Sequence, residues 1–562
     1  MPHLPKLSTR HLRGDIFGGV TAAVVALPLA LAFGVSSGAG AIAGLYSAVF
    51  VGFFAALFGG TPSQISGPTG PMTVVMAAVF AAVTASNPEN GVALAFTVVM
   101  LGGLFQILFG ILRLGRYITL MPYTVISGFM SGVGFIILCL EIGPFFGHEA
   151  QSGVIASLQH VPEYLAAPNW AATGLGILTL AIVFGAPAKL NRILPSPLIA
   201  LIVCTLISIL AFPGTDIPRI GDIPSGLPQL QLPQLNLAQL KTIVGYGLML
   251  AALGAIDSLL TSLVADNITS TQHDPNQELV GQGIGNVISG LFGGLPGAGA
   301  TMRTVINVHS GGKTSLSGMI HALVLLTIVL GAGPLTAQIP HTVLAGILIK
   351  VGIDIIDWEF LGRAHKVSLK TTGIMYIVLL LTVFVDLIAA VAVGVFVANM
   401  LTIERLSNIQ SSRVQLITTP SDESNLSYRE QELLTQAQGQ ILLFRLGGPM
   451  SFGAAKSIAR RMAIVEKYEV LILDLGDVPF LGVTAALAVE NMVKASRSRN
   501  RMVLIVGAEG EVFERLQRLK ILTRLAPDCR IHDRLVALEY AVAHIDALAD
   551  VPIVTSSSEL SR

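Results

Sequence analysis

Ser66-Gly67-Pro68-Thr69-Gly70-Pro71-Met72-Thr73 opens an apolar run at 74–83, and Leu295-Pro296-Gly297-Ala298-Gly299-Ala300-Thr301-Met302-Arg303-Thr304 opens a second one at 305–308. Proline lacks a backbone donor and glycine disfavours helix, so each stretch predicts a membrane span that is unwound at its start. Unwound backbone at membrane depth is tolerated only where protein or a water-filled cavity satisfies it. Broken segments at matching places in two halves of a chain are typical of a transporter's substrate site.

Each break is followed by a half-helix, whose first N–H groups are free and whose N-terminal end carries a partial positive charge. Two such ends that point at each other form an anion site without a fixed cationic side chain. The hydroxyls of Thr69 and Thr301 lie at these ends. Glycine and proline also kink ordinary membrane helices, and for one segment alone that reading would be preferred. The matched pair favours a site.

The composition separates a membrane part from a soluble part. The chain has 562 residues, of which 52% are hydrophobic and 12% charged, whereas soluble proteins carry about a quarter charged residues. Residues 1–403 hold 30 charged positions, and the 159 residues of 404–562 hold 38. We therefore expect a transmembrane transport domain at 1–403 and a soluble domain at 404–562. The net charge is zero, which gives no reason to expect a nucleic-acid partner.

Apolar runs of about 20 residues predict membrane-spanning helices. The clear candidates are 15–35, 41–60, 92–112, 121–143, 170–188, 195–212, 242–264, 316–333 and 371–402, and the shorter or glycine-broken ones are 68–84, 280–294, 300–310 and 342–356. Because 371–402 is long enough for two spans broken near Asp386, the total is about fourteen. Repeats at roughly 15–212 and 241–403, with seven spans each, would have opposite orientations and form an inverted repeat.

The basic residues Lys6, Arg10 and Arg13 predict a cytoplasmic N-terminus. An even number of spans then returns the C-terminal domain to the cytoplasm. The lipid bilayer is thus an expected partner, and the expected location is the plasma (inner) membrane, crossed many times.

A carboxylate lies in the middle of the first span of the second half. Asp257 is costly in a bilayer and is therefore a candidate functional residue. Thr261 lies one turn later, on the same helix face. With nearby unwound carbonyls they form an all-oxygen set that suits a hard cation such as Na⁺; the carboxylate could instead carry a proton or be hydrogen-bonded for packing. Arg303 either provides electrostatic support for the anion or pairs with a carboxylate elsewhere.

The motifs around these residues resemble the SulP family of anion transporters. They are Asp257-Ser258-Leu259-Leu260-Thr261, Asp266, Asn276-Gln277-Glu278-Leu279, Gly281-Gln282-Gly283, the stretch 294–304 and Asn307. The resemblance covers essentially the whole chain. It implies a polytopic α-helical membrane protein of fourteen spans in a 7+7 inverted repeat, divided into core and gate domains, with a C-terminal STAS domain. It also implies that the anion binds between the half-helices of spans three and ten.

Within the family, the sequence is most similar to the cyanobacterial BicA-type sodium-dependent bicarbonate transporters. The similarity implies that bicarbonate is held by Thr69, Ala300 and Thr301. It further implies that Na⁺, as the coupling ion, is held by Asp257, Thr261, Gly299 and Thr301. No cofactor and no other metal are expected, since the three cysteines lack metal-ligand spacing.

The soluble part alternates strands with helices. Apolar runs at 440–446, 469–475 and 501–507 have strand character, and helical patterns at 453–467, 484–499 and 511–522 separate them. This order predicts a small α/β fold, which resembles a STAS domain. In the stretch Pro479-Phe480-Leu481-Gly482-Val483-Thr484-Ala485, only Thr484 keeps a hydroxyl of the family's run, and we consider it a possible regulatory residue. The expected role of this domain is homodimerisation or regulation.

The leading functional hypothesis is Na⁺-dependent bicarbonate symport by alternating access. One alternative is a proton-coupled sulfate or dicarboxylate transporter of the same fold, with Asp257 as the proton carrier. Another is an anion channel or a signalling protein led by its STAS-like domain. An enzyme is not expected, because no nucleophile–base pair or metal set is visible.

Overall fold

The structure is a computed structural model of the chain. It describes residues 11–86, 90–118, 122–151, 153–187, 190, 194–212, 216–221, 230–234, 240–331, 336–385, 387–419, 426–462 and 467–549. Lys6, Arg10 and Asp386 lie outside these residues. Internal contacts divide the chain into two compact units, 1–398 and 399–562, with the division inside one helix. Each unit is described by itself.

The first unit is helical, and the order of its elements repeats. The first half contains α1 (Leu12–Ser36), α2 (Ala41–Phe58), β1 (Ser66–Gly67), α3 (Gly70–Ser86), α4 (Gly91–Ile111), α5 (Gly115–Ile118), α6 (Tyr123–Leu140), α7 (Ile142–Phe145), α8 (Val154–Gln159), α9 (Val161–Ala166), α10 (Trp170–Gly185) and α12 (Ser196–Ala211). The second half contains α13 (Leu240–Thr269), α14 (Pro275–Leu291), β2 (Ala298–Gly299), α15 (Thr301–His309), α16 (Ser315–Gly331), α18 (His341–Ile355), α19 (Trp358–Val367), α20 (Leu369–Phe384) and α21 (Leu387–Ser412). In both halves, two helices, a two-residue strand, and then a shorter helix follow one another.

The two short strands hold the halves together. β1 pairs with β2 in antiparallel register, Ser66 opposite Gly299 and Gly67 opposite Ala298. Antiparallel neighbours are related by a local two-fold axis, which is the relation expected between the two copies of an inverted repeat. Each strand directly precedes a half-helix, so the pairing brings the starts of α3 and α15 into the same region.

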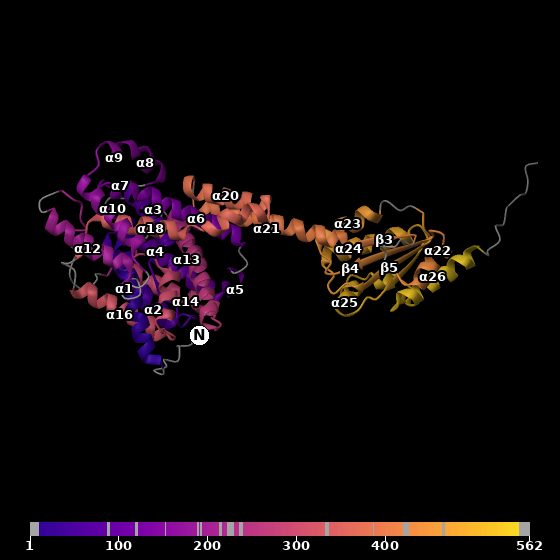
Figure 1. Cartoon of the computed structure of the whole chain (residues 1–562). Helices are drawn as coiled ribbons and strands as arrows, with labels where there is room; N and C mark the ends of the chain where they lie inside the picture. The colour runs from indigo at the N-terminus through magenta and orange to yellow at the C-terminus, as the bar shows by residue number, and fades with distance from the viewer. Residues whose placement is uncertain are drawn as a thin grey trace, which may run out of the picture. The chain divides into compact units, whose positions relative to one another are not determined.

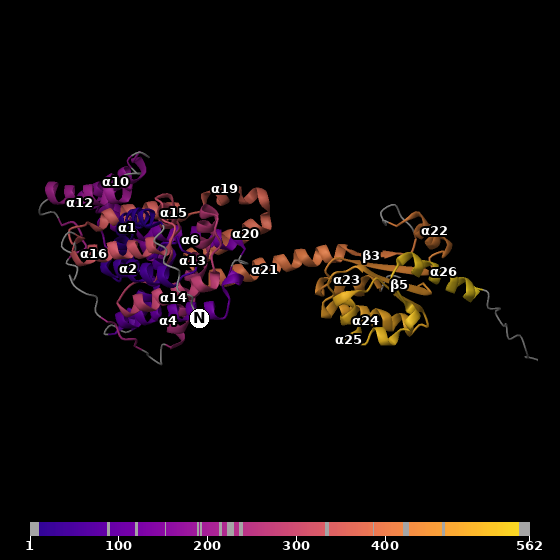
Figure 2. The ribbon, with the colours of Figure 1, turned by 90° about the horizontal axis from the view of Figure 1, so that it is seen from below.

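Helix packing has the same symmetry. α1 packs against α16 as α13 packs against α4, and α2 packs against α16 as α14 packs against α4. Figures 1 and 2 show α1, α2, α4, α13 and α14 gathered in one bundle. A second group consists of α6 with α18 and α20, and α10 with α12 and α18. These two groups correspond to the predicted division into core and gate domains.

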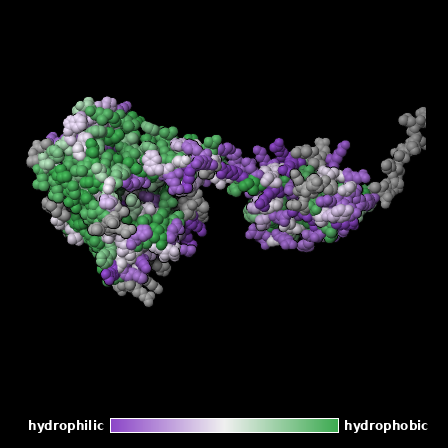
Figure 3. All heavy atoms as spheres, in the orientation of Figure 1, coloured by the Kyte–Doolittle hydropathy of each residue, from purple (hydrophilic) through white to green (hydrophobic). Residues whose placement is uncertain are grey.

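The surface of this unit is apolar, as a membrane domain requires. In the described part of the chain, six helices are long and apolar enough to cross a membrane, and five more are shorter apolar helices. Large apolar side chains on several helices are exposed, among them Leu104, Ile177, Leu206 and Leu323. Figure 3 shows hydrophobic residues over most of the face in view. An exposed apolar surface of this extent indicates contact with lipid. The count of fourteen spans stays a prediction.

The second unit is a five-stranded sheet with helices on both faces. Its elements are β3 (Val414–Ile417), α22 (Tyr428–Gln436), β4 (Ile441–Gly447), α23 (Phe452–Met462), β5 (Val470–Asp477), α24 (Val483–Arg497), β6 (Met502–Val506), α25 (Gly510–Arg518), η3 (Leu522–Arg524), η4 (Pro527–Cys529), β7 (Arg530–Ile531) and α26 (Arg534–Ala549). The strand order is β3-β4-β5-β6-β7, with β3 antiparallel to β4 and the others parallel.

Alternating residues of the central strands pack into two separate hydrophobic cores, one on each face of the sheet. In β4, Leu442, Phe444 and Leu446 pack with α23, α24 and α25 on one face, while Ile441 and Leu443 pack with α22 and α26 on the other. Strands that are buried on both faces read as continuous apolar runs, which is why these were visible in the sequence.

The strands predicted at 440–446, 469–475 and 501–507 correspond to β4, β5 and β6. The helix predicted at 511–522 ends earlier, at Arg518, because Lys520 adopts a positive φ of 56° that a helix cannot continue through. Residues 463–466 of the helix predicted at 453–467 lie outside the described residues. β3, β7, α22 and α26 were not predicted.

Candidate anion and cation site

The unwound segments before the half-helices are satisfied by side chains of the second half. α14 carries a polar stripe on one face, Glu278, Gln282 and Asn286, which are spaced four residues apart and are all buried. Glu278 Oε2 accepts from the N–H groups of Gly60 (2.9 Å) and Thr61 (3.0 Å). These contacts hold the backbone that leads into the first break. Unwound backbone at membrane depth needs such hydrogen bonds from the protein itself.

The same stripe secures the second break. Asn286 accepts from the N–H of Gly297 at 2.7 Å and donates to the carbonyl of Gly297 at 2.9 Å. Ser258, on α13, also holds the second break, where it accepts from the N–H of Gly299 at 3.0 Å. Gln282 of the stripe reaches the first break and donates to the Ser66 hydroxyl at 2.6 Å. Sequence reasoning missed these positioning residues, although the i, i+4, i+8 spacing of polar residues in α14 is a signal that could have found them.

Thr261 joins three of the four predicted cation ligands. Its hydroxyl donates to the Gly299 carbonyl at 3.0 Å and lies 2.8 Å from the Thr301 hydroxyl. Thr261 is fully buried, whereas Thr301 is exposed. α13 therefore presents a hydroxyl at the point where β2 ends and α15 begins.

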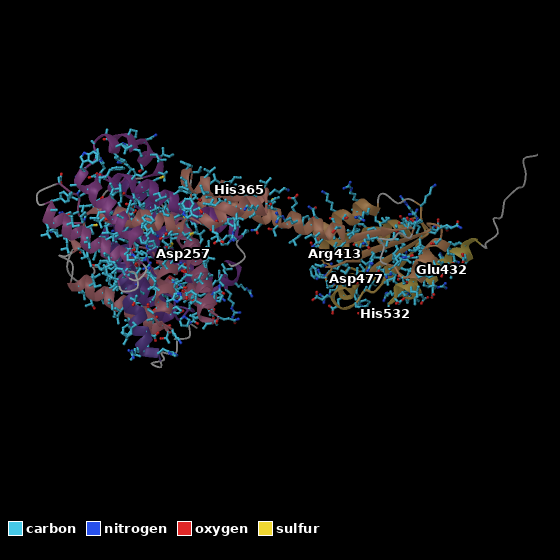
Figure 4. The ribbon with its side chains drawn as sticks, in the orientation of Figure 1. Asp257, His365, Arg413, Glu432, Asp477 and His532 are labelled. Carbon is cyan, nitrogen blue, oxygen red and sulfur yellow. The ribbon has the colours of Figure 1, made fainter. Side chains whose placement is uncertain are left out.

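Asp257 lies one turn before Thr261 in α13, within the membrane domain (Figure 4). The Thr69 hydroxyl lies near the Asp257 carboxyl group. Within the part of the chain that the structure describes, neither the Thr69 hydroxyl nor Asp257 Oδ2 has a hydrogen bond of good geometry, and both atoms are buried. Asp257 also lines a small chamber of about 20 Å³, together with apolar residues of α6, α13 and α21. That volume holds about one water-sized particle. A buried carboxylate one helix turn from a hydroxyl that itself contacts the Gly299 carbonyl and the Thr301 hydroxyl fits a hard cation.

Arg303 belongs to the second break and contacts the backbone of the first. Its side chain is buried, Nη2 donates to the Pro68 carbonyl, and Nη1 has no hydrogen-bond partner among the residues described. The guanidinium also attracts the Asp257 carboxylate. The positive charge thus lies at the first break and within electrostatic reach of the carboxylate. Its role toward the anion stays a prediction.

The residues predicted to bind the anion differ in whether their N–H and hydroxyl groups are already engaged in hydrogen bonds. The Ala300 N–H already donates to the Ile65 carbonyl at 2.8 Å, so it is engaged in this conformation. The first N–H groups of α15, beginning at Thr301, have no intrahelical partner. The Thr73 hydroxyl donates back to the Thr69 carbonyl at 2.8 Å. The Thr69 hydroxyl lies near the Asp257 carboxyl group and has no hydrogen bond of good geometry to any residue that the structure describes.

A wider cavity of about 470 Å³ lies next to the Asp257 chamber. Its lining includes Tyr123, Ser127 and residues 354–359 at the ends of α6, α18 and α19. The chamber and the cavity share the apolar residues Ile126, Met130 and Leu260. These three side chains, on α6 and α13, border both the Asp257 chamber and the wider cavity.

Thr484 is the second residue of α24 and is exposed. A phosphate at this place would lie at the N-terminal end of the helix, where negative charge is favoured. Its regulatory role stays a prediction.

Most of the chain matches known protein families. Residues 12–378 match the Sulfate permease family, and residues 432–535 match the STAS domain. The chain belongs to the sulfate permease (SulP) family. The predicted fold class is thereby confirmed: a helical SulP transport domain followed by a STAS domain.

Two curated relatives in this family cover nearly the whole chain. Both are called Bicarbonate transporter BicA. The protein from Synechocystis is 55% identical over 96% of this chain and 95% of its own length. The protein from Picosynechococcus is 53% identical over 99% of both chains. A Putative sulfate transporter of Bacillus subtilis is 29% identical over 82% of this chain and 84% of its own length.

Solved structures agree with the fold. The transmembrane domain of a cyanobacterial bicarbonate transporter BicA is 58% identical, with a TM-score of 0.65, and covers 68% of this chain and 98% of its own. Murine Slc26a9, an anion transporter, is 18% identical with a TM-score of 0.82 over 96% of this chain and 93% of its own. This second likeness shows the shared fold.

Proposed function

We propose that this protein is a Na⁺-dependent bicarbonate symporter that works by alternating access. The observation that carries the proposal is the arrangement of Thr261, which links the Gly299 carbonyl to the Thr301 hydroxyl. Thr261 lies one turn from Asp257, whose buried Oδ2 atom has no hydrogen-bond partner among the described residues. The relatives named for bicarbonate transport, at 53–55% identity over nearly the whole chain, support the choice of anion.

The geometry suggests how the two ions depend on each other. A cation among Asp257, Thr261, Gly299 and Thr301 would neutralise the carboxylate and hold the start of α15 in place. Bicarbonate would then bind at the adjoining half-helix ends, with Thr69 and Thr301 as hydroxyl donors and Ala300 in the wall. Since each ion binds better when the other is present, the coupling is a difference in affinity between conformational states.

The remaining features of the proposal concern location and assembly. The protein acts in the plasma membrane, with the N-terminus and the STAS domain in the cytoplasm, as the basic N-terminal segment supports. The STAS domain would form a homodimer. Na⁺ is carried as a coupling ion, and no cofactor takes part.

The test is uptake of labelled bicarbonate into vesicles that contain the purified chain, with and without an inward Na⁺ gradient. Uptake that is stimulated by Na⁺ is expected, and equal uptake under both conditions would contradict the proposal. Labelled sulfate is measured in parallel with and without a proton gradient. Proton-driven sulfate uptake exceeding bicarbonate uptake would instead support the alternative that the more distant sulfate transporter relatives suggest.

A further inference from the structure

An open groove of about 710 Å³ lies between the C-terminal end of α21 and α23 in the second unit. We call it the basic groove. Its polar lining consists mainly of Lys456, Arg460, Arg461, Ser407, Ser411 and Ser457. The transport site and the predicted regulatory Thr484 lie elsewhere, so the proposed function leaves this groove unexplained.

The basic groove is built by direct contacts between its two helices. A Cβ atom at Gly453 would lie 2.5 Å from the Ser407 hydroxyl oxygen, so only glycine permits this close approach. The Ser411 hydroxyl donates to the Gly453 carbonyl at 3.3 Å. The Ser451 hydroxyl donates to the side chain of Gln410 at 2.7 Å. The end of α21 and α23 therefore form one packed pair with a fixed opening.

The chemistry of the lining suits an anion that carries phosphate oxygens. Lys456, Arg460 and Arg461 contribute three positive charges, and the described lining contains no carboxylate. No ion pair is formed by these three cations within the described residues. Ammonium and guanidinium groups flanked by hydroxyl donors are the groups with which proteins bind phosphate.

Charge is segregated within the second unit. Residues 399–413 and 452–462 hold five Lys or Arg and one Glu, whereas the rest of 404–562 holds 14 basic and 18 acidic residues. The tendency of basic residues to stay in the cytoplasm acts within about 15–20 residues of a span. It can account for Arg405 and Arg413, the latter labelled in Figure 4, but not for the cations of α23.

The place of the groove along the chain indicates its partner. α21 is one continuous helix from Leu387 to Ser412, and Ile403 is the last residue of its apolar stretch. At 1.5 Å per residue, Ser407 lies about 6 Å and Ser412 about 14 Å further along the axis. A membrane surface potential decays over about 8 Å at physiological salt. The α21 side of the groove therefore begins within the reach of the charge on the lipid headgroups.

We propose that the basic groove binds the phosphate headgroup of an anionic lipid and so holds α23 at the membrane surface. The interaction would anchor the STAS domain through α23 as well as through α21. This lipid interaction depends on the chain spanning a membrane. It does not depend on which ion the transport domain carries.

The test uses the full chain in phosphatidylcholine vesicles with increasing phosphatidylglycerol. Hydrogen exchange of residues 452–462 should slow as the anionic lipid increases. Neutralising one cation, as in Arg460→Gln, should raise the half-saturating phosphatidylglycerol content about fivefold, and the triple variant K456Q/R460Q/R461Q should abolish the protection. The control variant K494Q/R497Q/R499Q removes the same charge from the end of α24 and should behave as the unmodified chain.

Three results would overturn the proposal. The first is equal exchange with and without phosphatidylglycerol. The second is protection by inorganic phosphate added to phosphatidylcholine vesicles, which would identify a soluble ligand instead of a lipid. The third is an equal loss of protection in the control variant, which would show a general charge effect. Bicarbonate transport is not part of the readout, so a failure of the proposed function would leave this result intact.

Discussion

Replacing Thr261 with valine tests the centre of the proposed cation site. The change keeps the side-chain shape but removes a fully buried hydroxyl that contacts the Gly299 carbonyl at 3.0 Å and the Thr301 hydroxyl at 2.8 Å. The variant loses an oxygen ligand for the cation. It also leaves the Gly299 carbonyl without this donor, while the exposed Thr301 hydroxyl can turn to solvent.

The magnitude follows from the loss of one oxygen partner of a buried charge. A polar contact to a charged group contributes about 1.5–3 kcal/mol, and we take about 1–2 kcal/mol because water beside the exposed Thr301 can replace part of the lost ligand. Each 1.4 kcal/mol is about tenfold in an equilibrium constant, so the half-saturating Na⁺ concentration for bicarbonate uptake should rise about 5- to 30-fold. Uptake at saturating Na⁺ should change much less.

The assay is initial-rate uptake of labelled bicarbonate into vesicles over a range of Na⁺ concentrations. Thr382→Val is the matched control, because Thr382 is also buried but its hydroxyl donates only to the Val378 carbonyl of its own helix, at 2.7 Å. The control should keep the Na⁺ dependence of the unmodified chain. A Thr261→Val protein whose half-saturating Na⁺ concentration stays unchanged would refute the assignment of this hydroxyl to the cation site.

Three further predictions address the carboxylate, a glycine and the STAS domain. Asp257→Asn should abolish Na⁺-stimulated uptake while the protein still elutes as a single species; retained Na⁺ dependence would place the cation site elsewhere. Gly67→Ala should lower the stability of the detergent-solubilised chain by about 1–3 kcal/mol in thermal unfolding. The reason is that φ of Gly67 is +155° and the new Cβ would lie 2.8 Å from Arg303 Nη1. Gly174→Ala is the control and should show no such loss, because a Cβ at Gly174 would have no neighbour within 4 Å among the described residues. In the STAS domain, burial alone would raise the pKa of Glu430, but hydrogen bonds from Arg534 and Ser427 hold it below its ordinary value. The stability that these hydrogen bonds contribute is present above the unfolded-state pKa of about 4.3 and is lost as the pH falls through the folded-state pKa. Proteolysis of residues 426–549 should therefore accelerate on acidification. Arg534→Gln should remove most of that acid response.

Much of the architecture could be predicted from local sequence. The long apolar runs predicted α1, α2, α4, α6 and α13, because a bilayer demands continuous apolar helix. The doubly buried strands β4, β5 and β6 were visible for a similar reason. β3 and β7 were not, because they are short edge strands with two to four residues and are defined by their neighbours rather than by their own pattern.

The breaks at 66–73 and 295–304, and their matching places in two halves, were determined by sequence alone, since glycine and proline act on their own backbone. Asp257 and Thr261 share a helix face for an equally local reason. Tertiary structure decided the rest: the pairing of β1 with β2, the contact of Thr261 with Gly299 and Thr301, and the buried place of Arg303 against Pro68. Those contacts join residues about 40 to 235 positions apart, and only the packing of the two halves brings them together.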